Sequence, residues 1–288
     1  MEHAHAGRTG HGVRGSSEGP GSLAEMLDLD AEITRSYWNE VMRWIEQALP
    51  TNVRRIIDLG AGTGAGTFAL ARRFDHAEVV AVDASDEMLE RVREKAVDRG
   101  ISDRIKAVQA DLDTNWPETG QVDLTWASMF MHHLTDVDGA LQRVHAATRD
   151  GGLIVIAEFT DPLRFLPDDL GLGEPGLESR CIEGFKRERF RSLPSFGLEW
   201  GRRLEKAGFS AIEERVFDLQ GDDTDPGRLA RYGRLWLERV SSAAAPYLSS
   251  DDLSVVKDLL ADGGPHSLEK RSDLRMHGSR VVVRAAKG

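Results

Sequence analysis

A glycine-rich loop in the first quarter of the sequence could hold a nucleotide-like ligand. Residues 58–64 read DLGAGTG and follow a short apolar run, so they stand where a buried strand would end and a helix would begin. Glycines lack a Cβ atom, so a ligand can approach their backbone, and the first turn of the helix presents free N–H groups. A loop of this kind can also be only a tight turn between a strand and a helix.

Two acidic residues follow the next two apolar runs. Asp83 lies 25 positions after Asp58, about the spacing at which an acidic side chain accepts hydrogen bonds from the ribose hydroxyls of an adenosine ligand. Asp111 could accept a hydrogen bond from an adenine amino group while Leu112 packs on the ring. Each has a simpler interpretation, because Asp83 could cap the next helix and Asp111 could be a turn residue. Carboxylates at the ends of three successive strands favour a ligand site, since doubly wound folds bind ligands at that edge.

The elements that would position these residues alternate along the chain. Apolar runs within residues 53–59, 77–83, 104–111, 121–127 and 151–159 predict strands, and segments with helical periodicity separate most of them. The second and fifth runs contain apolar stretches without polar alternation, which is typical of strands covered on both faces. The sequence therefore predicts an α/β fold with a doubly wound parallel sheet.

The segments on either side of this core are expected to form a tail, a lid and a cap. Residues 1–21 are rich in Gly, His and Ser and predict a mobile tail, whereas 22–50 carry the apolar stripe of a helical lid. The core, 51–159, is followed by an insertion (160–199), a continuation of the core (200–219), a helical insertion (220–272) and a C-terminal strand (273–288).

Aromatic side chains in these insertions suit a pocket for a flat or apolar small molecule. A small satellite core under long connections is the alternative. A basic run over residues 180–191 could meet an anionic ligand or could be a solvated helix face. The aromatic residues are Phe165, Phe185, Phe190, Phe196, Trp200, Tyr232 and Trp236.

The charge and cysteine content exclude several classes of partner. The 288 residues include 37 basic and 48 acidic ones, and the formal net charge of −11 disfavours nucleic acid and anionic lipid surfaces as partners. Cys181 is the single cysteine, so we expect no intramolecular disulfide and a cytoplasmic location. We expect no membrane span, because no apolar stretch is long enough, and no metal site, because no cluster has metal-ligand spacing.

The sequence resembles the class I S-adenosylmethionine-dependent methyltransferases, in particular the small-molecule group of the ubiquinone-biosynthesis type. The resemblance covers about 53–159 and rests on DLGAGTG, on VDAS with ML four residues after Ala84, on ADL at 110–112, on ASMFMHHL at 127–134 and on RDGG at 149–152. It implies a Rossmann-like seven-stranded sheet whose last strand is antiparallel and inserted beside the strand before it, with helical insertions forming a cap. It also implies S-adenosyl-L-methionine as cofactor and a small-molecule acceptor.

The resemblance implies a cofactor site at the carboxyl edge of the sheet. Asp58 and the glycine loop would hold the methionine moiety, Asp83 the ribose, and Asp111 with Leu112 the adenine edge. Ser128 and Met129 would lie near the sulfonium, and a tyrosine of the first helix could close over the cofactor. The full set is Tyr37, Asp58, Gly60, Ala61, Gly62, Gly64, Asp83, Ala84, Met88, Asp111, Leu112, Ser128 and Met129.

Three residues are candidates for a general base. Methyl transfer is a direct displacement, so a base is needed only when the acceptor carries a proton at neutral pH, as a phenol, an alcohol or an acidic carbon does. His133 and His132 follow the fourth strand, and imidazole titrates near neutrality. Glu158 ends the fifth strand and is a further candidate. The simpler interpretations are packing or capping for the histidines and a solvated strand end for the glutamate.

Two other functions fit parts of the sequence. An NAD(P)-dependent oxidoreductase would use the looser fingerprint Gly60-x-Gly62-x-x-Ala65, but Asp58 beside that loop would repel a pyrophosphate. The Tyr-x-x-x-Lys pair of many short-chain reductases is absent from the sequence. A non-catalytic scaffold that binds the cofactor is the other alternative.

Overall fold

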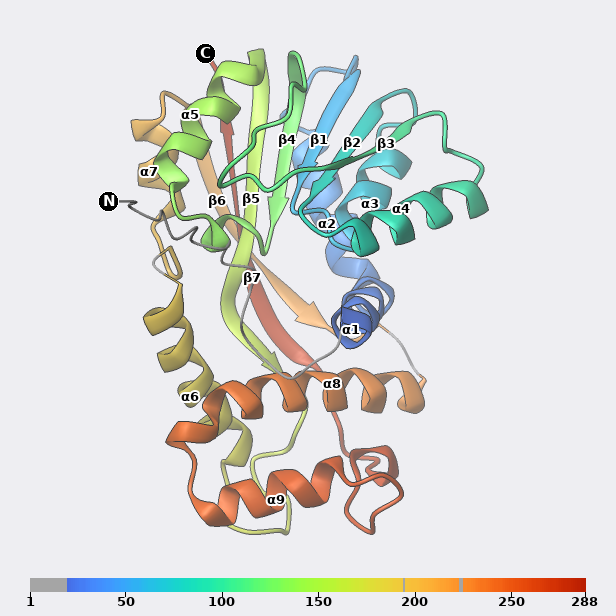
Figure 1. Cartoon of the computed structure of the whole chain (residues 1–288), viewed down its shortest axis with the longest axis vertical. Helices are drawn as coiled ribbons and strands as arrows, with labels where there is room; N and C mark the ends of the chain where they lie inside the picture. Colours follow the sequence, from blue (N-terminus) through green and yellow to red (C-terminus); the bar gives the residue numbers. More distant parts are fainter. Residues whose placement is uncertain (1–19, 194, 223–224) are drawn as a thin grey trace, which may run out of the picture.

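A single twisted sheet runs through the upper part of the protein (Figure 1). The computed structural model describes residues 20–193, 195–222 and 225–288, so the expected tail lies, up to residue 19, outside the described residues. The described residues form a seven-stranded sheet in the order β3-β2-β1-β4-β5-β7-β6. The strands are β1 (Arg55–Leu59), β2 (Glu78–Asp83), β3 (Ile105–Gln109), β4 (Val122–Ser128), β5 (Thr148–Arg164), β6 (Ser210–Gln220) and β7 (His277–Ala286).

The direction of the strands confirms the expected fold class. Strands β1 to β5 pair in parallel, whereas β7 runs antiparallel between β5 and β6. The chain order reverses between β1 and β4, and doubly wound sheets bind ligands at such a switch point, beyond the carboxyl ends of the strands. The sheet therefore places the glycine loop, which follows β1, at the position where a ligand is expected.

Helices cover both faces of the sheet. The first face packs against α2 (Arg35–Glu46), α3 (Ala65–Arg73) and α4 (Asp86–Asp98), and the second against α5 (Val137–Ala147) and α7 (Trp200–Lys206) (Figure 1). The central strands are buried on both sides, which explains why β2 and β4 are almost uniformly apolar or buried. The side chain of Ser85 accepts a hydrogen bond from Met88 N and so caps α4.

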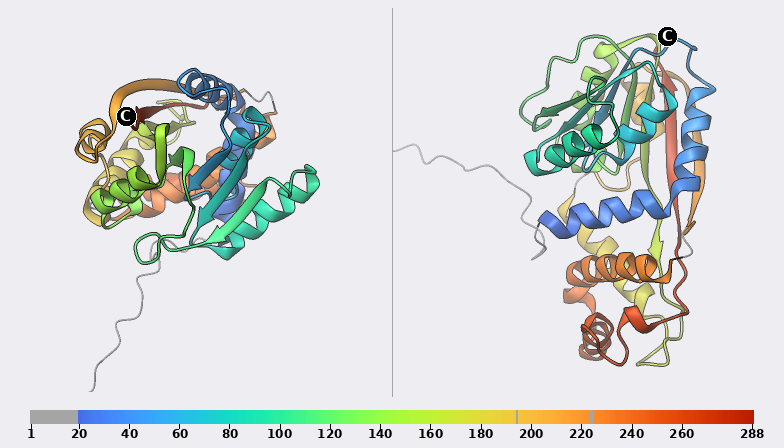
Figure 2. Two further views of the ribbon diagram at one scale, coloured as in Figure 1. Left: turned by 90° about the horizontal axis from the view of Figure 1, so that it is seen from above. Right: turned by 90° about the vertical axis from the view of Figure 1, so that its right-hand side faces the viewer.

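The lid region differs from the single helix that its apolar stripe predicts. It forms α1 (Pro20–Ile33) and α2, with Thr34 between them. The Thr34 hydroxyl donates a hydrogen bond to the Asp30 carbonyl (2.6 Å), a local bond that often bends helices. Figure 2 shows the result: α1 lies across the carboxyl edge of the sheet, while α2 runs along its face.

The fifth strand is longer than the sequence predicts. It continues past Phe159 to Arg164 with two register shifts, and its last partner on β4 is the pair Ser128↔Ala157. Beyond that pair only β5, β7 and β6 continue, and they reach α8 (Pro226–Ala244) at the lower end of the molecule (Figure 1). We call this three-stranded part the β5 extension. It forms a wall beside the carboxyl end of β4.

The remaining helices gather beyond the β5 extension. They are α6 (Leu177–Ser192) and α9 (Ser250–Leu260), with the short helices η2 (Ala245–Tyr247) and η3 (Leu268–Lys270). The short helix η1 (Met131–His133) instead follows β4 at the carboxyl edge of the sheet. α8 packs against both α6 and α1. Among the described residues, no helix is long and apolar enough to cross a membrane.

Candidate functional site

The glycine loop is fixed to β2 by its backbone. Gly60 N and Ala61 N both donate hydrogen bonds to the Val82 carbonyl (2.8 and 3.0 Å). Gly60 has φ 69°, and Gly64, which precedes α3, has φ 90°, a region that side chains with a Cβ rarely adopt. The loop therefore has a defined shape at the carboxyl edge of the sheet, as the sequence predicts.

The carboxylate of Asp83 lies against this loop. Its Oδ2 accepts a hydrogen bond from Gly62 N (2.8 Å), and its Oδ1 accepts one from Ser85 N (2.9 Å). A carboxylate offers about four lone-pair positions, so these two bonds leave capacity for a ligand. The structure brings Asp83 and the glycine loop together although 21 residues separate the two bonded residues.

Asp58 is buried beneath the first turn of α3. Thr67 Oγ1 donates a hydrogen bond to its Oδ2 (2.7 Å). Burial raises the pKa of Asp58 to about 7, an effect that the Thr67 bond opposes and the nearby charge of Asp83 increases. Trp126 Nε1 and Thr63 Oγ1 are buried in the same region and have no hydrogen-bond partner within the described ranges. These two buried polar atoms beside the loop could form hydrogen bonds with a ligand.

The residues expected around an adenine lie at the ends of β2 and β3. Met88 and Leu112 are buried, whereas Ala84 and Asp111 are exposed. Asp111 Oδ1 accepts a hydrogen bond only from Asp113 N (3.1 Å) among the described residues. Two apolar side chains and one carboxylate therefore lie where β2 and β3 end at the carboxyl edge of the sheet.

The chain turns sharply where β4 ends. Met129 has φ 55°, which is unusual for a residue with a side chain, and its N–H donates to the Ala157 carbonyl (2.8 Å). Phe130 then lies on the glycine loop, so close that a Cβ built on Gly60 would be 2.2 Å from the ring. The sequence motif contains Phe130, but residue type alone gave no reason to select it. Ser128 and Met129 lie at the carboxyl end of β4 as expected.

A buried histidine and glutamate meet just beyond the end of β4, and Glu158 lies within β5 rather than at its end as the sequence predicted, because the strand continues to Arg164. His132 Nδ1 lies 2.7 Å from Glu158 Oε2, and both residues are 7% exposed. The second carboxylate oxygen, Glu158 Oε1, is buried and unpaired within the described residues. Phe196 packs edge-on against the His132 ring at 5.8 Å. The structure therefore joins two of the three candidate bases.

The third candidate, His133, has different surroundings. Its ring centroid lies 4.2 Å from that of His132, but the residue is exposed and lies outside the pair with Glu158. The geometry therefore favours His132 over His133 as the oriented base.

Comparison with known proteins decides the family of the core. A family model described as a methyltransferase domain matches residues 56–152. Residues 56–152 form a methyltransferase domain. This match confirms the class I S-adenosylmethionine-dependent family that the motifs suggested. The matched segment holds the glycine loop, Asp83 and His132, whereas Tyr37 and Glu158 lie outside it.

Curated relatives resemble the same methyltransferase domain. The ubiquinone/menaquinone biosynthesis C-methyltransferase UbiE of Idiomarina loihiensis is 33% identical over 110 residues, which are 38% of this chain and 44% of the relative. The malonyl-[acyl-carrier protein] O-methyltransferase of Halorhodospira halophila is 35% identical over 119 residues, 41% of this chain and 39% of the relative. The chain thus spans less than half the length of these relatives.

Solved structures share the fold over most of the chain. The YcgJ protein of Bacillus subtilis has a TM-score of 0.52 and 15% identity, and covers 88% of this chain and 98% of its own. Phosphoethanolamine N-methyltransferase 2 of Haemonchus contortus was solved with phosphomonomethylethanolamine and S-adenosylhomocysteine. It has a TM-score of 0.51 and 20% identity, and the match covers 87% of this chain and 52% of that protein. At these identities the likeness concerns the fold.

Helix α1, in the segment that the sequence predicts to form a lid, lies against the glycine loop of the methyltransferase domain. Lys95 Nζ, from α4, bonds to Asp28 of α1 (2.5 Å) and to the Thr63 carbonyl of the loop (2.9 Å). A Cβ built on Gly62 would be 3.1 Å from a methyl group of Leu27, also from α1. Lys95 therefore connects α1 to the glycine loop. Nothing in the sequence indicated this contact, because Lys95 lies on a polar helix face.

Tyr37 lies at the start of α2, close to Phe217 of β6 and Arg280 of β7. It is 2% exposed, and its hydroxyl has no hydrogen-bond partner in the part of the chain that the structure describes. Its ring packs edge-on against Trp38 (5.5 Å) and Phe217 (6.2 Å). Burial raises its pKa, which the nearby charge of Arg280 partly offsets. The hydroxyl is therefore a buried polar group available to a ligand.

Most aromatic residues of the insertions pack against one another outside the methyltransferase domain. Phe165 contacts Tyr232 (5.2 Å) and Phe185 contacts Trp236 (6.0 Å), which places them between the β5 extension, α6 and α8. Trp200 packs on the opposite face of the sheet. Phe190 is largely exposed and contacts Phe196, which in turn contacts His132.

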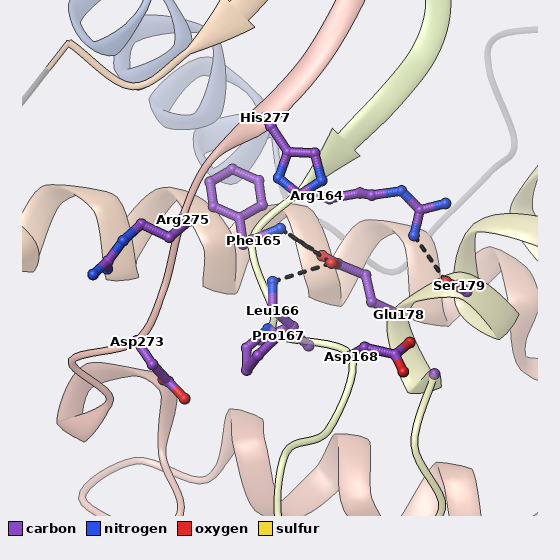
Figure 3. A pocket seen from close by; sticks show the side chains of 11 residues that line it. Arg164, Phe165, Leu166, Pro167, Asp168, Glu178, Ser179, Asp273, Arg275 and His277 are labelled. Atoms are coloured by element: carbon purple, nitrogen blue, oxygen red, sulfur yellow. Dashed lines mark hydrogen bonds between the residues drawn. The ribbon is translucent and has the colours of Figure 1, made fainter.

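A cavity of about 330 Å³ lies beside the end of β5, outside the methyltransferase domain (Figure 3). Glu178 points into its wall, where its carboxylate accepts hydrogen bonds from Phe165 N (2.9 Å) and Leu166 N (3.1 Å). These bonds attach α6 to β5. The cavity lacks the glycine loop and the His132–Glu158 pair, so it is separate from the site described above.

Proposed function

We propose that this protein transfers the methyl group of S-adenosylmethionine to a small-molecule acceptor. The observation that carries the proposal is the contact between Asp83 and Gly62, which holds a glycine loop and a free carboxylate face together at the switch point of a methyltransferase domain. When bound, the cofactor supplies a methyl group that a nucleophile can displace from sulfur. The chain has to bind the two reactants, align them and exclude water.

The residues at the carboxyl edge fit such a cofactor. Asp83 has lone pairs free for the two ribose hydroxyls, and Met88 and Leu112 offer apolar contacts for an adenine beside Asp111. Thr63 Oγ1 and Trp126 Nε1, near the loop, are buried and unpaired among the described residues. Buried polar atoms are usually paired, so a hydrogen bond to a bound ligand would explain them. The remaining members of the proposed set are Tyr37, Asp58, Gly60, Ala61, Gly62, Gly64, Ala84, Ser128 and Met129.

The pair of His132 and Glu158 suits proton removal from the acceptor. With its Nδ1–H donated to Glu158, His132 presents the lone pair of Nε2 to an O–H or an acidic C–H. The Glu158 carboxylate then stabilises the imidazolium that forms. A base of this kind contributes about 10²- to 10⁴-fold in rate, so the pair favours an acceptor that carries a proton at neutral pH.

Binding and transfer test this proposal separately. Calorimetry with S-adenosylmethionine and S-adenosylhomocysteine is expected to detect both ligands, and Asp83→Asn is expected to weaken them about tenfold or more. Asp86→Asn is the matched control, because Asp86 is exposed and lies three residues after Asp83, and the substitution removes the same charge. If the wild type binds neither ligand, the proposal fails. Binding of a nicotinamide dinucleotide instead would favour a reductase, and binding without transfer to any acceptor would leave a scaffold.

A further inference from the structure

A buried arginine on β7 has fewer hydrogen bonds than its guanidinium requires. Arg280 is 4% exposed, and a guanidinium carries five N–H donors. Within the described ranges it makes one hydrogen bond, from Nη2 to Asp30 Oδ1 (2.9 Å), and its Nε is buried without a partner. Buried donors of native proteins are almost always paired with protein, water or ligand. Arg280 therefore indicates a missing hydrogen-bond acceptor.

The surrounding protein supplies little of the missing acceptor capacity. Asp30 already accepts a second hydrogen bond on the same oxygen, from the Tyr232 hydroxyl (2.7 Å). The guanidinium carbon lies over the rings of Tyr37 and Phe159, 5.0 and 5.3 Å from their centroids. The Tyr37 hydroxyl lies near the guanidinium, but among the described residues it makes no well-aligned hydrogen bond with it.

Two more unpaired polar atoms belong to the same corner of the fold. They are the Tyr37 hydroxyl, which can donate or accept, and Glu158 Oε1, which is an acceptor. Phe159, which contacts Arg280, follows Glu158 in the β5 extension, where β4 no longer covers the strand edge. A ligand at this uncovered edge of β5 can therefore be reached from both faces of the strand. The donors of Arg280 and Tyr37 lie on one face, and the His132–Glu158 pair lies on the other.

The position of Arg280 favours the acceptor over the adenosine part of the cofactor. β7 lies on the β5 side of β4, about 14 Å from β1, whereas Asp83 and Asp111, the residues proposed for the adenosine, follow β2 and β3 on the other side of β1. The ligand group at Arg280 is therefore assigned to the acceptor, and Tyr37 beside it would border both ligands.

The local charges favour a neutral oxygen. Asp30 neutralises Arg280, and Glu158 adds a negative charge on the other side of the corner, so a carboxylate ligand would meet net negative charge. A carbonyl oxygen can accept from both unpaired donors, Arg280 Nε–H and the Tyr37 hydroxyl, without adding charge. The aromatic rings of Tyr37 and Phe159 beside it suit a flat skeleton.

We propose that Arg280, with Tyr37, binds a carbonyl oxygen of the acceptor and so selects flat hydroxy-carbonyl compounds whose hydroxyl faces His132 and Glu158. This assignment rests on the proposed methyl transfer. Arg280 is then a specificity-determining residue that the core motifs do not contain.

Three probes of the same size class test the assignment. They are 4-hydroxyacetophenone, which has the carbonyl, 4-ethylphenol, which lacks it, and 4-hydroxybenzoate, which replaces it by an anion. Each is titrated by calorimetry into protein saturated with S-adenosylhomocysteine. We expect the ketone to bind about tenfold tighter than either analogue, because a site built for a hydrogen bond rejects a ligand that cannot make it.

Variants of Arg280 separate recognition from folding. Arg280→Gln is expected to remove the preference and leave the affinity for S-adenosylhomocysteine within about twofold. Arg280→Lys can keep the ion pair with Asp30 but loses the planar fork, so it gives the same readout if the first variant does not fold. Arg284→Lys is the control, because Arg284 is buried on the same strand and contacts Trp44 instead.

Each outcome decides between clear alternatives. No preference for the ketone in the wild type, including no binding of any probe, overturns the assignment, and so does an equal loss in the Arg284 control. Tighter binding of 4-hydroxybenzoate than of the ketone would show that the site recognises an anionic oxygen and not a carbonyl, and would also overturn the assignment. Failure of the wild type to bind S-adenosylhomocysteine is seen in the first titration and concerns the proposed function instead.

Discussion

Nδ1 of His132 lies 2.7 Å from Oε2 of Glu158, although His132 follows β4, Glu158 lies within β5, and the two are separated by 26 positions. Both are buried, and the contact orients the imidazole. A histidine that is held by a carboxylate in this way has one nitrogen fixed as a donor and the other available as a base. This contact yields the first prediction.

His132→Ala is expected to lower turnover about 10²- to 10⁴-fold on an acceptor with an O–H nucleophile, because the proton then has no oriented base. His133→Ala is expected to have a much smaller effect, since His133 lies outside the pair with Glu158. Transfer of a tritiated methyl group measures both variants, and calorimetry with S-adenosylhomocysteine checks that binding persists. A larger loss in the His133 variant would contradict the assignment.

The raised pKa of Asp58 predicts a pH dependence of stability. Its folded value of about 7 lies above the unfolded value of about 3.9, so the folded state holds the proton more tightly. Asp58 should therefore contribute on the order of 2 to 4 kcal/mol to a fall in the free energy of unfolding without ligand as the pH rises from 4 to 8. Asp58→Asn should flatten this decline, which urea denaturation at several pH values measures.

Glu178 is the internal comparison for this measurement, because burial also raises its pKa to about 7. The decline should persist in part in each single variant, Asp58→Asn and Glu178→Gln, and should largely vanish in the double variant. An unchanged decline in the double variant would show that other groups cause it.

The contact of Phe130 with Gly60 predicts an unusually severe glycine substitution. Gly60→Ala places a Cβ 2.2 Å from the ring in addition to forcing a side chain into φ 69°. Gly100→Ala is the matched control, since its φ is 65° and nothing lies within 4 Å of its Cβ. The control should cost about 1 kcal/mol, and Gly60→Ala clearly more, with loss of S-adenosylhomocysteine binding. Equal costs in thermal unfolding would rule out the contact.

The bonds of Lys95 predict that the lid can be loosened without damage to the core. Lys95→Met removes the contacts to Asp28 and to the Thr63 carbonyl, so amide hydrogen exchange in α1 should become several-fold faster. Release of S-adenosylhomocysteine should accelerate in parallel. Lys106→Met removes an ion pair with Glu78 at the opposite end of the sheet and should change neither rate.

The sequence predicts the cofactor half of the protein well because that half is built from local signals. Strands β1, β2 and β4 are short buried runs, and the glycine loop and Asp83 stand directly at the ends of the first two. The strand order and the antiparallel last strand, which the resemblance implied, are confirmed. The roles of the individual site residues remain predictions.

Contacts between distant residues could not be predicted from the sequence. Arg280 and Asp30 are 250 positions apart, and neither lies in a motif. His132 and His133 are adjacent and chemically identical, so only the turn of η1 decides which of them meets Glu158. Likewise, Thr34 divides the lid because of one side-chain hydrogen bond within an otherwise continuous apolar stripe.

The insertion of β7 between β5 and β6 also sets an order for folding. Its pairing with β5 joins residues as far apart as Leu153 and Ala286, so it closes a much longer loop than any pairing among β1 to β4. The strands that bear the glycine loop can therefore pair first, while β5 and β6 keep unpaired edges until β7 arrives between them. Arg280 lies on β7, so it reaches its place beside Asp30 only when this long-range pairing forms, whereas the strands around the glycine loop need only shorter-range contacts.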